Sequence, residues 1–386
     1  MTRRIHLDHN STTPQRPEAR ARLLELLELG LGNPSSLHTP GRRARAWVDD
    51  ARAQAAAALG VQEDEIFFTS GATEANNLAL FGLLEARGAR ARVVTTPVEH
   101  SSVLAPARRL AARGHPLELA PVDAGGLPDP EELLSLARAP GTALVSVGAA
   151  NNETGACPDL ALLAAGLPTT GARPLLHSDA VQAIGRIPFR PMDLGLDLAS
   201  LSGHKFGAGM GAGILWKRRG VTLEPRAFGG GQELDLRPGT ENVPAIAACA
   251  LALELAVREQ AEVARRNAAL ARELWRGLVA CLPGVRLIGP PLDSPRRLPN
   301  TLCVLVPGTD GKVLVTRLDL AGLEISAGSA CASGSVEPSH VLVALGLARD
   351  EARSGLRLSL GRNTGEEDCK RALAVFHEEF SSSRAT

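Results

Sequence analysis

The sequence has no excess of either charge and no long apolar run. Its 386 residues include 42 basic and 42 acidic side chains, so no overall field points to nucleic acid or an anionic membrane as a partner. No apolar run is long enough to cross a bilayer, and the two arginines near Met1 are followed by no apolar stretch of a leader peptide. We therefore expect a soluble, cytoplasmic protein that acts on a small molecule.

Cysteines are also few, and they are scattered along the chain. Their spacing is neither that of paired metal ligands nor that of a disulfide-rich secreted domain. We expect free thiols and no metal site. The six cysteines are Cys157, Cys249, Cys281, Cys303, Cys331 and Cys369.

Short apolar runs alternate with helical segments through the first two thirds of the chain, a pattern typical of a mostly parallel sheet covered on both faces. From Val243 to about Leu282 the chain is rich in Ala, Leu, Glu and Arg, which predicts long helical segments that lead out of the sheet. We expect an α/β fold with a large domain, residues 15–257, and a smaller α+β domain formed by residues 1–14 and 258–386. The apolar runs are residues 66–69, 92–96, 117–120, 143–147, 174–177 and 213–216.

Polar residues follow several of these runs. Because ligands of open α/β sheets bind outside the carboxyl ends of the strands, we expect these residues to share one site. Lys205 can form a Schiff base with pyridoxal phosphate (PLP), and Asp179, with Gln182 one turn later, can pair with the pyridinium nitrogen. The helix opening at Gly71-Ala72-Thr73 offers backbone N–H groups to a phosphate.

Each feature alone has an ordinary structural explanation. The helix opening could be an ordinary N-cap, and His100 could be a scaffold histidine held by hydrogen bonds. Asn151-Asn152 could form a turn, and Lys205 could be a surface charge. Their order along the chain and their shared edge favour a PLP site over these separate explanations.

An ordered series of motifs resembles the cysteine desulfurases, which belong to the class V aminotransferase group of the fold-type I PLP-dependent transferases. The resemblance runs nearly end to end. The motifs are Leu7-Asp-His-Asn-Ser-Thr-Thr-Pro14, Gly32-Asn-Pro-Ser-Ser36, Phe68-Thr-Ser-Gly-Ala-Thr-Glu74, Val98-Glu-His100, Asn151-Asn-Glu-Thr-Gly155, Ser202-Gly-His-Lys205, Gly229-Gly-Gly-Gln-Glu233, Arg237-Pro-Gly-Thr-Glu-Asn242, Ser326-Ala-Gly-Ser-Ala-Cys331 and Arg357-Leu-Ser-Leu-Gly-Arg362.

The resemblance implies a role for each matching residue. Lys205 would hold the cofactor and move protons, Asp179 would pair with the pyridinium, and His100 would stack on the ring and act as acid or base. Arg357 would grip the substrate carboxylate through a bidentate contact, with Asn152 beside it. Two further residues, Gln182 and Asn152, would hold the hydroxyl side of the cofactor ring. The phosphate would be bound by Ala72, Thr73, Ser202 and His204. Thr240 would reach the phosphate of a neighbouring subunit's cofactor, which implies a homodimer.

Cys331 is the candidate nucleophile, in a stretch of small residues between Ala327 and Glu337 that resembles the longer-loop branch of the family. The implied reaction converts L-cysteine to L-alanine and leaves the sulfur on Cys331 as a persulfide, for delivery to acceptors such as iron–sulfur cluster assembly. An unperturbed thiol is only a few per cent thiolate at neutral pH. A base such as His100, or the substrate's own proton balance, must take up the thiol proton.

The chain departs from the family in two places. After Lys205 it reads Phe206-Gly-Ala-Gly-Met-Gly211 where the family usually has Phe-x-Gly-Pro, and tyrosine is absent throughout. Housekeeping members carry a C-terminal tail that docks an iron–sulfur scaffold protein. Here the sequence ends six residues after Phe380, which leaves docking of a scaffold or other sulfur acceptor open.

Other functions remain alternatives. A selenocysteine lyase shares the fold and resembles the motifs at residues 229–233 and 237–242. An ordinary aminotransferase, or another PLP-dependent lyase, would not need Cys331. A degenerate member acting only in binding or sulfur relay would be expected to lack Lys205 or Asp179, and both are present.

Overall fold

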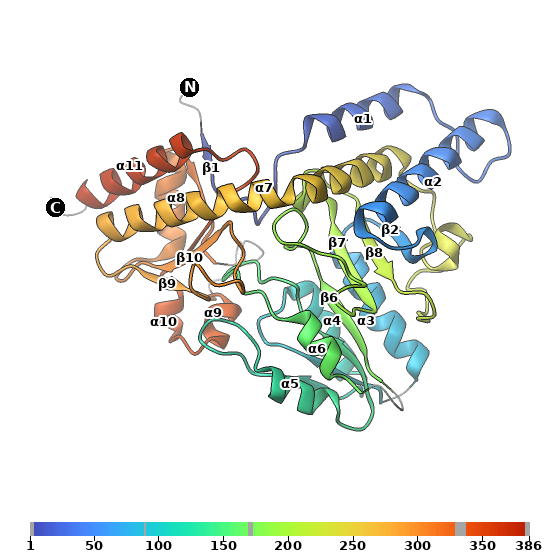
Figure 1. Cartoon of the computed structure of the whole chain (residues 1–386), viewed down its shortest axis with the longest axis horizontal. Helices are drawn as coiled ribbons and strands as arrows, with labels where there is room; N and C mark the ends of the chain where they lie inside the picture. Colours follow the sequence, from blue (N-terminus) through green and yellow to red (C-terminus); the bar gives the residue numbers. More distant parts are fainter. Residues whose placement is uncertain (1–3, 89, 169–172, 329–336, 383–386) are drawn as a thin grey trace.

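The largest sheet of the described residues has seven strands in the order β2-β8-β7-β6-β5-β3-β4. Figure 1 labels β2, β8, β7 and β6 of this sheet, to one side of β9 and β10. The computed structural model describes residues 4–88, 90–168, 173–328 and 337–382. Only β8 runs opposite to its neighbours, so the mostly parallel sheet expected from the sequence is confirmed. The strands are β2 (Ile66–Thr69), β3 (Arg92–Thr95), β4 (Leu117–Leu119), β5 (Thr142–Ser146), β6 (Leu175–Asp179), β7 (Leu198–Ser202) and β8 (Gly213–Lys217).

Helices cover both faces of this sheet because successive strand residues point to opposite sides. Phe67 and Leu144 pack on one face with α3 (Ala72–Arg87) and α4 (Ser101–Ala111). Their neighbours Phe68 and Val145 pack on the other face. That second face is covered by α2 (Thr39–Leu59), α5 (Pro130–Ala137), α6 (Leu160–Gly166) and the beginning of α7 (Val243–Cys281).

The helical region after Val243 is one unbroken helix of 39 residues, α7. Its first part is buried in the sheet core as far as Ala256, and its last part, from Leu270 to Leu278, is buried in a second core. The expected domain boundary at residues 257 and 258 falls inside this helix, and the two-domain division stays a prediction. The second core includes β10 (Thr301–Leu305), β12 (Gly355–Ser359), α8 (Gly311–Leu320) and α11 (Glu366–Ser382), with β9 (Arg286–Ile288) at the sheet edge.

The N-terminal segment joins the two cores. Strand β1 (Ile5–His6) pairs in parallel with β11 (Leu323–Glu324), and Leu7 is buried in the second core. The chain then runs to α1 (Pro17–Glu28), which packs on α7. Among the described residues, no helix combines the length and the apolar character that a bilayer crossing requires. The remaining short elements are η1 (Glu63–Glu65), η2 (Gly203–Lys205), η3 (Gln232–Asp235), α9 (His340–Ala344) and α10 (Arg349–Ala352).

The start of β8 packs directly against the turn that opens α3, and this contact yields a test of the fold. A Cβ atom added to Gly213 would lie 2.5 Å from the Cα atom of Gly71 and 2.7 Å from the carbonyl oxygen of Leu201. Because these are backbone atoms, we expect Gly213→Ala to cost about 1–3 kcal/mol and to lower the melting temperature. Gly365→Ala is the control, since its added Cβ atom meets only Asp368 Oδ2 at 3.9 Å. Equal melting temperatures for the two variants would contradict the packing.

Candidate active site

A cavity of about 570 Å³ lies at the carboxyl ends of the parallel strands. Polar side chains from the strand ends, from the N-terminal segment and from β12 meet there. The sequence-predicted residues that line it are Ala72, Thr73, His100, Asn152, Asp179, Gln182, Ser202, His204, Lys205 and Arg357. The common edge expected from the sequence therefore brings these residues together.

One end of the cavity has the features of an anion site. Ala72 and Thr73 form the first turn of α3, whose leading backbone N–H groups have no acceptor within the helix. The Ser202 hydroxyl lies 3.7 Å from where a Cβ atom on Gly71 would stand, so this hydroxyl borders the same turn. Burial lowers the pKa of His204 to about 4, and its Nδ1 lies 3.2 Å from Thr12 Oγ1. A phosphate group fits this set of donors.

Lys205 follows β7 in the short turn η2, and its ammonium group is held by backbone oxygens. Nζ donates to the carbonyl oxygens of Asn10 and Ser11, at 2.7 Å each. Both residues belong to the motif at residues 7–14, but the sequence alone indicates no role for them. Because carbonyl oxygens are fixed and do not titrate, they orient the amine over the whole working pH range.

Asp179 ends β6, and each of its carboxylate oxygens accepts a hydrogen bond. Val181 N donates to Oδ1 at 3.0 Å, and Asn76 Nδ2 donates to Oδ2 at 2.8 Å. Gln182 donates through Nε2 to the Asn10 carbonyl, whereas its Oε1 is buried with no partner among the described residues. A carboxylate beside an unpartnered amide oxygen fits a ring with a protonated nitrogen and a hydroxyl group.

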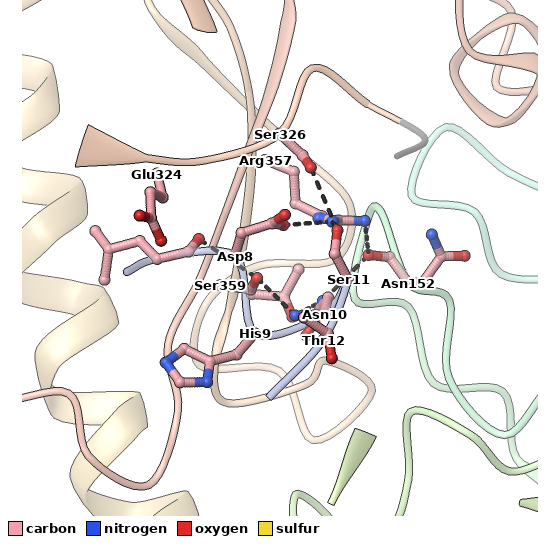
Figure 2. A network of polar contacts seen from close by, with 12 residues as sticks. Asp8, His9, Asn10, Ser11, Thr12, Asn152, Glu324, Ser326, Arg357 and Ser359 are labelled. Atoms are coloured by element: carbon pink, nitrogen blue, oxygen red, sulfur yellow. Dashed lines mark hydrogen bonds and ion pairs between the residues drawn. The ribbon is translucent and has the colours of Figure 1, made fainter. Parts of the chain in front are cut away.

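The Arg357 guanidinium is buried and already bound. Its Nη2 contacts Asp8 Oδ1 and Ser11 Oγ at 2.7 Å, and its Nη1 donates to the Asn152 carbonyl at 3.1 Å (Figure 2). Only 1% of this side chain is exposed. The predicted carboxylate-binding arginine is thus held in place by an acid 349 residues away in the sequence, and the local pattern gave no sign of that partner.

Two buried acids near the cavity were not predicted. Burial raises the pKa of Glu99 to about 7, although Thr96 Oγ1 and Gly148 N donate to its oxygens at 2.8 and 3.0 Å. Burial also raises the pKa of Glu153, which accepts a 2.6 Å hydrogen bond from Ser339. Both lie in the motifs at residues 98–100 and 151–155, but a single sequence does not reveal that these carboxyl groups are buried.

Of the two remaining predicted residues, Thr240 and Cys331, the structure describes only Thr240. Thr240 is exposed and does not line the cavity. Cys331 lies outside the described residues. The other cysteines are poor nucleophiles, because burial raises their thiol pKa values. The pKa is about 12 for Cys157, Cys249 and Cys303 and about 11 for Cys369, and it is raised for Cys281.

Known proteins resemble this chain over nearly its whole length. Residues 5–372 match the family "Aminotransferase class-V". A cysteine desulfurase of Cereibacter sphaeroides is 41% identical, with 96% of this chain and 94% of the relative covered. The cysteine desulfurase IscS of Dictyoglomus turgidum is 38% identical, with 97% and 94% covered. The solved structure of a NifS-like protein superimposes with a TM-score of 0.91 at 37% identity, covering 98% of this chain and 100% of that one.

Glu99 supplies a pH test of the site. Its folded pKa, about 7, is above the usual 4.5, so the unfolded chain loses the proton first as the pH rises. The free energy of unfolding is therefore higher at low pH, where Glu99 is protonated in both states, and it falls as the pH rises through about 7. The decrease is about 1.4 kcal/mol for each pH unit between the unfolded and the folded pKa. Between about pH 5 and 8, we expect the melting temperature of Glu99→Gln to fall less than that of wild type. Parallel curves for the two proteins would contradict the burial of a titrating Glu99.

Proposed function

We propose, since the chain belongs to the class-V aminotransferase family, that it is a cysteine desulfurase. In this reaction L-cysteine becomes L-alanine and its sulfur passes to Cys331. The observation that carries the proposal is the meeting of Lys205, Asp179 and an anion-binding helix end in one cavity, in a chain about two fifths identical to a cysteine desulfurase.

The donor set of the cavity supports PLP as the cofactor. When bound, PLP supplies an aldehyde that takes up an amine and a pyridine ring that acts as an electron sink. Lys205 would hold the aldehyde and Asp179 the ring nitrogen. Gln182, whose buried Oε1 lacks a partner among the described residues, would face the ring hydroxyl with Asn152. The phosphate would lie at Ala72, Thr73, Ser202 and His204.

Lys205 and Arg357 would act on different groups of the substrate, the α-carbon and the carboxylate. Lys205 Nζ would take the proton from the substrate α-carbon, and its two carbonyl acceptors fix where that nitrogen can lie. Arg357, with Asn152, would orient the substrate carboxylate. Asp8 and Ser11 hold the guanidinium in place beforehand, so less conformational entropy is lost when the carboxylate binds.

Cys331 would accept the sulfur. Its thiolate attacks the substrate sulfur, an S–S bond forms as the Cβ–S bond breaks, and the electron pair left on carbon takes a proton to give alanine. Sulfur remains on Cys331 as a persulfide, and passing it to an acceptor, such as the machinery of iron–sulfur cluster assembly, restores the thiol. The raised thiol pKa values of the other cysteines support this assignment.

We further propose a homodimer that works in the cytoplasm. Large apolar side chains are exposed around the cavity and in the segment that leads to Thr240: Met210, which lines the cavity, is 78% exposed, and Phe228 is 88% exposed. A second chain that covered both side chains would remove apolar surface from water, which favours association. A second copy seated there would bring its Thr240 to the phosphate.

Lys205→Ala tests the cofactor assignment. We expect purified wild type to be yellow and to give a borohydride-stable protein–cofactor adduct, and Lys205→Ala to lose both the visible absorption and the adduct, because Lys205 provides the attaching amine. Lys370→Ala, an exposed lysine on α11, is the control and should keep both. An adduct retained by Lys205→Ala would refute the assignment.

Cys331→Ala tests the function itself. We expect the variant to fold, to bind the cofactor and to change its spectrum on addition of cysteine, but to form no alanine, because the C–S bond breaks only when a nucleophile accepts the sulfur. Mass spectrometry should find one added sulfur on wild type and none on the variant. Cys281→Ala, which removes a partly exposed thiol, is the control and should behave as wild type. Alanine formed by Cys331→Ala at the wild-type rate would exclude Cys331 as the nucleophile and favour a selenocysteine lyase or elimination reaction.

A further inference from the structure

A chain of buried hydrogen bonds links Asp179 to His100 behind the cavity. Asn76 Nδ2, on α3, donates to Asp179 Oδ2 and to Ser102 Oγ, at 2.8 Å each. Ser102 Oγ in turn lies 2.7 Å from His100 Nδ1. Asn76 is 0% exposed, Ser102 7% and Asp179 8%, so water does not compete for these bonds. Hydrogen bonds therefore connect residues from α3, α4 and the end of β6 to one imidazole ring.

The hydrogen bonds of this series can run in one direction only, from Asn76 to Ser102 and from Ser102 to His100. The reversed Asn76 amide would set its oxygen against the Asp179 carboxylate, so the amide nitrogen must face Asp179 and Ser102. Both hydrogens of that nitrogen are then used, Ser102 Oγ accepts one of them, and the Ser102 hydroxyl hydrogen is directed to His100 Nδ1. The Ser102 backbone N–H also donates to Nδ1, at 3.1 Å. With two donors aimed at it, Nδ1 must be unprotonated.

The surroundings favour the neutral ring over the imidazolium. His100 is the N-cap of α4, whose positive helix end disfavours a cation there. Among the described acids, Glu99 and Glu153 interact electrostatically with His100, and Asp179 is connected to it through Asn76 and Ser102. Each of these three acids accepts hydrogen bonds from other groups. Burial raises the pKa of Glu99 to about 7, which weakens its negative charge near neutral pH, and burial also raises the pKa of Glu153. A proton added at Nδ1 would face the Ser102 N–H group.

We propose that Asn76 and Ser102 are positioning residues that keep His100 neutral, with its proton on Nε2. His100 then acts in the reaction as a hydrogen-bond donor through Nε2, not as the base that takes the Cys331 thiol proton. The inference about the ring rests on hydrogen-bond geometry, and only its catalytic meaning rests on the proposed desulfurase function.

The test is long-range ¹H–¹⁵N NMR of the purified protein labelled with ¹⁵N-histidine, with the His100 signals assigned by their loss in His100→Gln. Between about pH 6 and 8 we expect wild type to show an unprotonated Nδ1 and a protonated Nε2. Ser102→Ala removes one donor to Nδ1, which should shift the tautomer ratio about three- to tenfold toward Nδ1–H and bring titration of the ring into that range. Asn76→Ala should shift it in the same direction by less.

Ser101→Ala is the matched control, because Ser101 is the exposed neighbour of Ser102 in the first turn of α4 and its loss should leave the His100 signals unchanged. A protonated Nδ1 in wild type at neutral pH would overturn the proposal, as would wild-type signals in both Ser102→Ala and Asn76→Ala. Circular dichroism checks the fold of each variant. The spectra need no turnover of cysteine, so a failure of the desulfurase function would appear separately, as absence of alanine in the wild-type assay.

Discussion

Two short hydrogen bonds from the Lys205 ammonium to the carbonyl oxygens of Asn10 and Ser11 connect the second core to the edge of the seven-stranded sheet. The same N-terminal segment carries Asp8, which binds Arg357 from β12. Lys205, in the turn after β7, and Arg357, on β12, are thus both held by one short N-terminal segment, the lysine by its backbone and the arginine by its side chains. The spacing of the two side chains would set the distance between the amine proposed to hold the cofactor and the substrate carboxylate, and the proposed chemistry depends on that distance.

The cavity combines uncharged imidazoles with one acid, Glu99, whose pKa lies near neutral pH. Burial lowers the pKa of His204 and of His177 to about 4, so both rings are uncharged near neutral pH. The hydrogen bonds around His100 favour the same state. Among the described residues that line the cavity, the basic side chains are therefore Lys205 and Arg357, which suits the proposed phosphate and substrate carboxylate. Neutral rings can donate or stack without adding charge that varies with pH.

The sequence patterns predicted the features that depend on residues close together in the chain. Apolar runs gave the strands of the large sheet, and polar residues after them gave most of the cavity lining, because the carboxyl ends of parallel strands lie at one edge. Contacts across long separations could not be predicted. The Arg357–Asp8 and Lys205–Asn10 contacts span 349 and 195 residues, and both involve the N-terminal segment that follows β1, the strand paired with β11. Asn76 lies in a polar stretch of α3, and only the packed structure shows it to be buried against Asp179.

The measurement that tests the proposed function most directly is the product analysis of purified, cofactor-loaded protein incubated with L-cysteine and a thiol reductant. We predict alanine and sulfide in equal amounts, with no requirement for a keto acid. Pyruvate and ammonia in place of alanine would indicate elimination, and alanine formed only from selenocysteine would indicate a selenocysteine lyase. Amino-group transfer that needs a keto acid would indicate an ordinary aminotransferase. Any of these results would contradict the central claim.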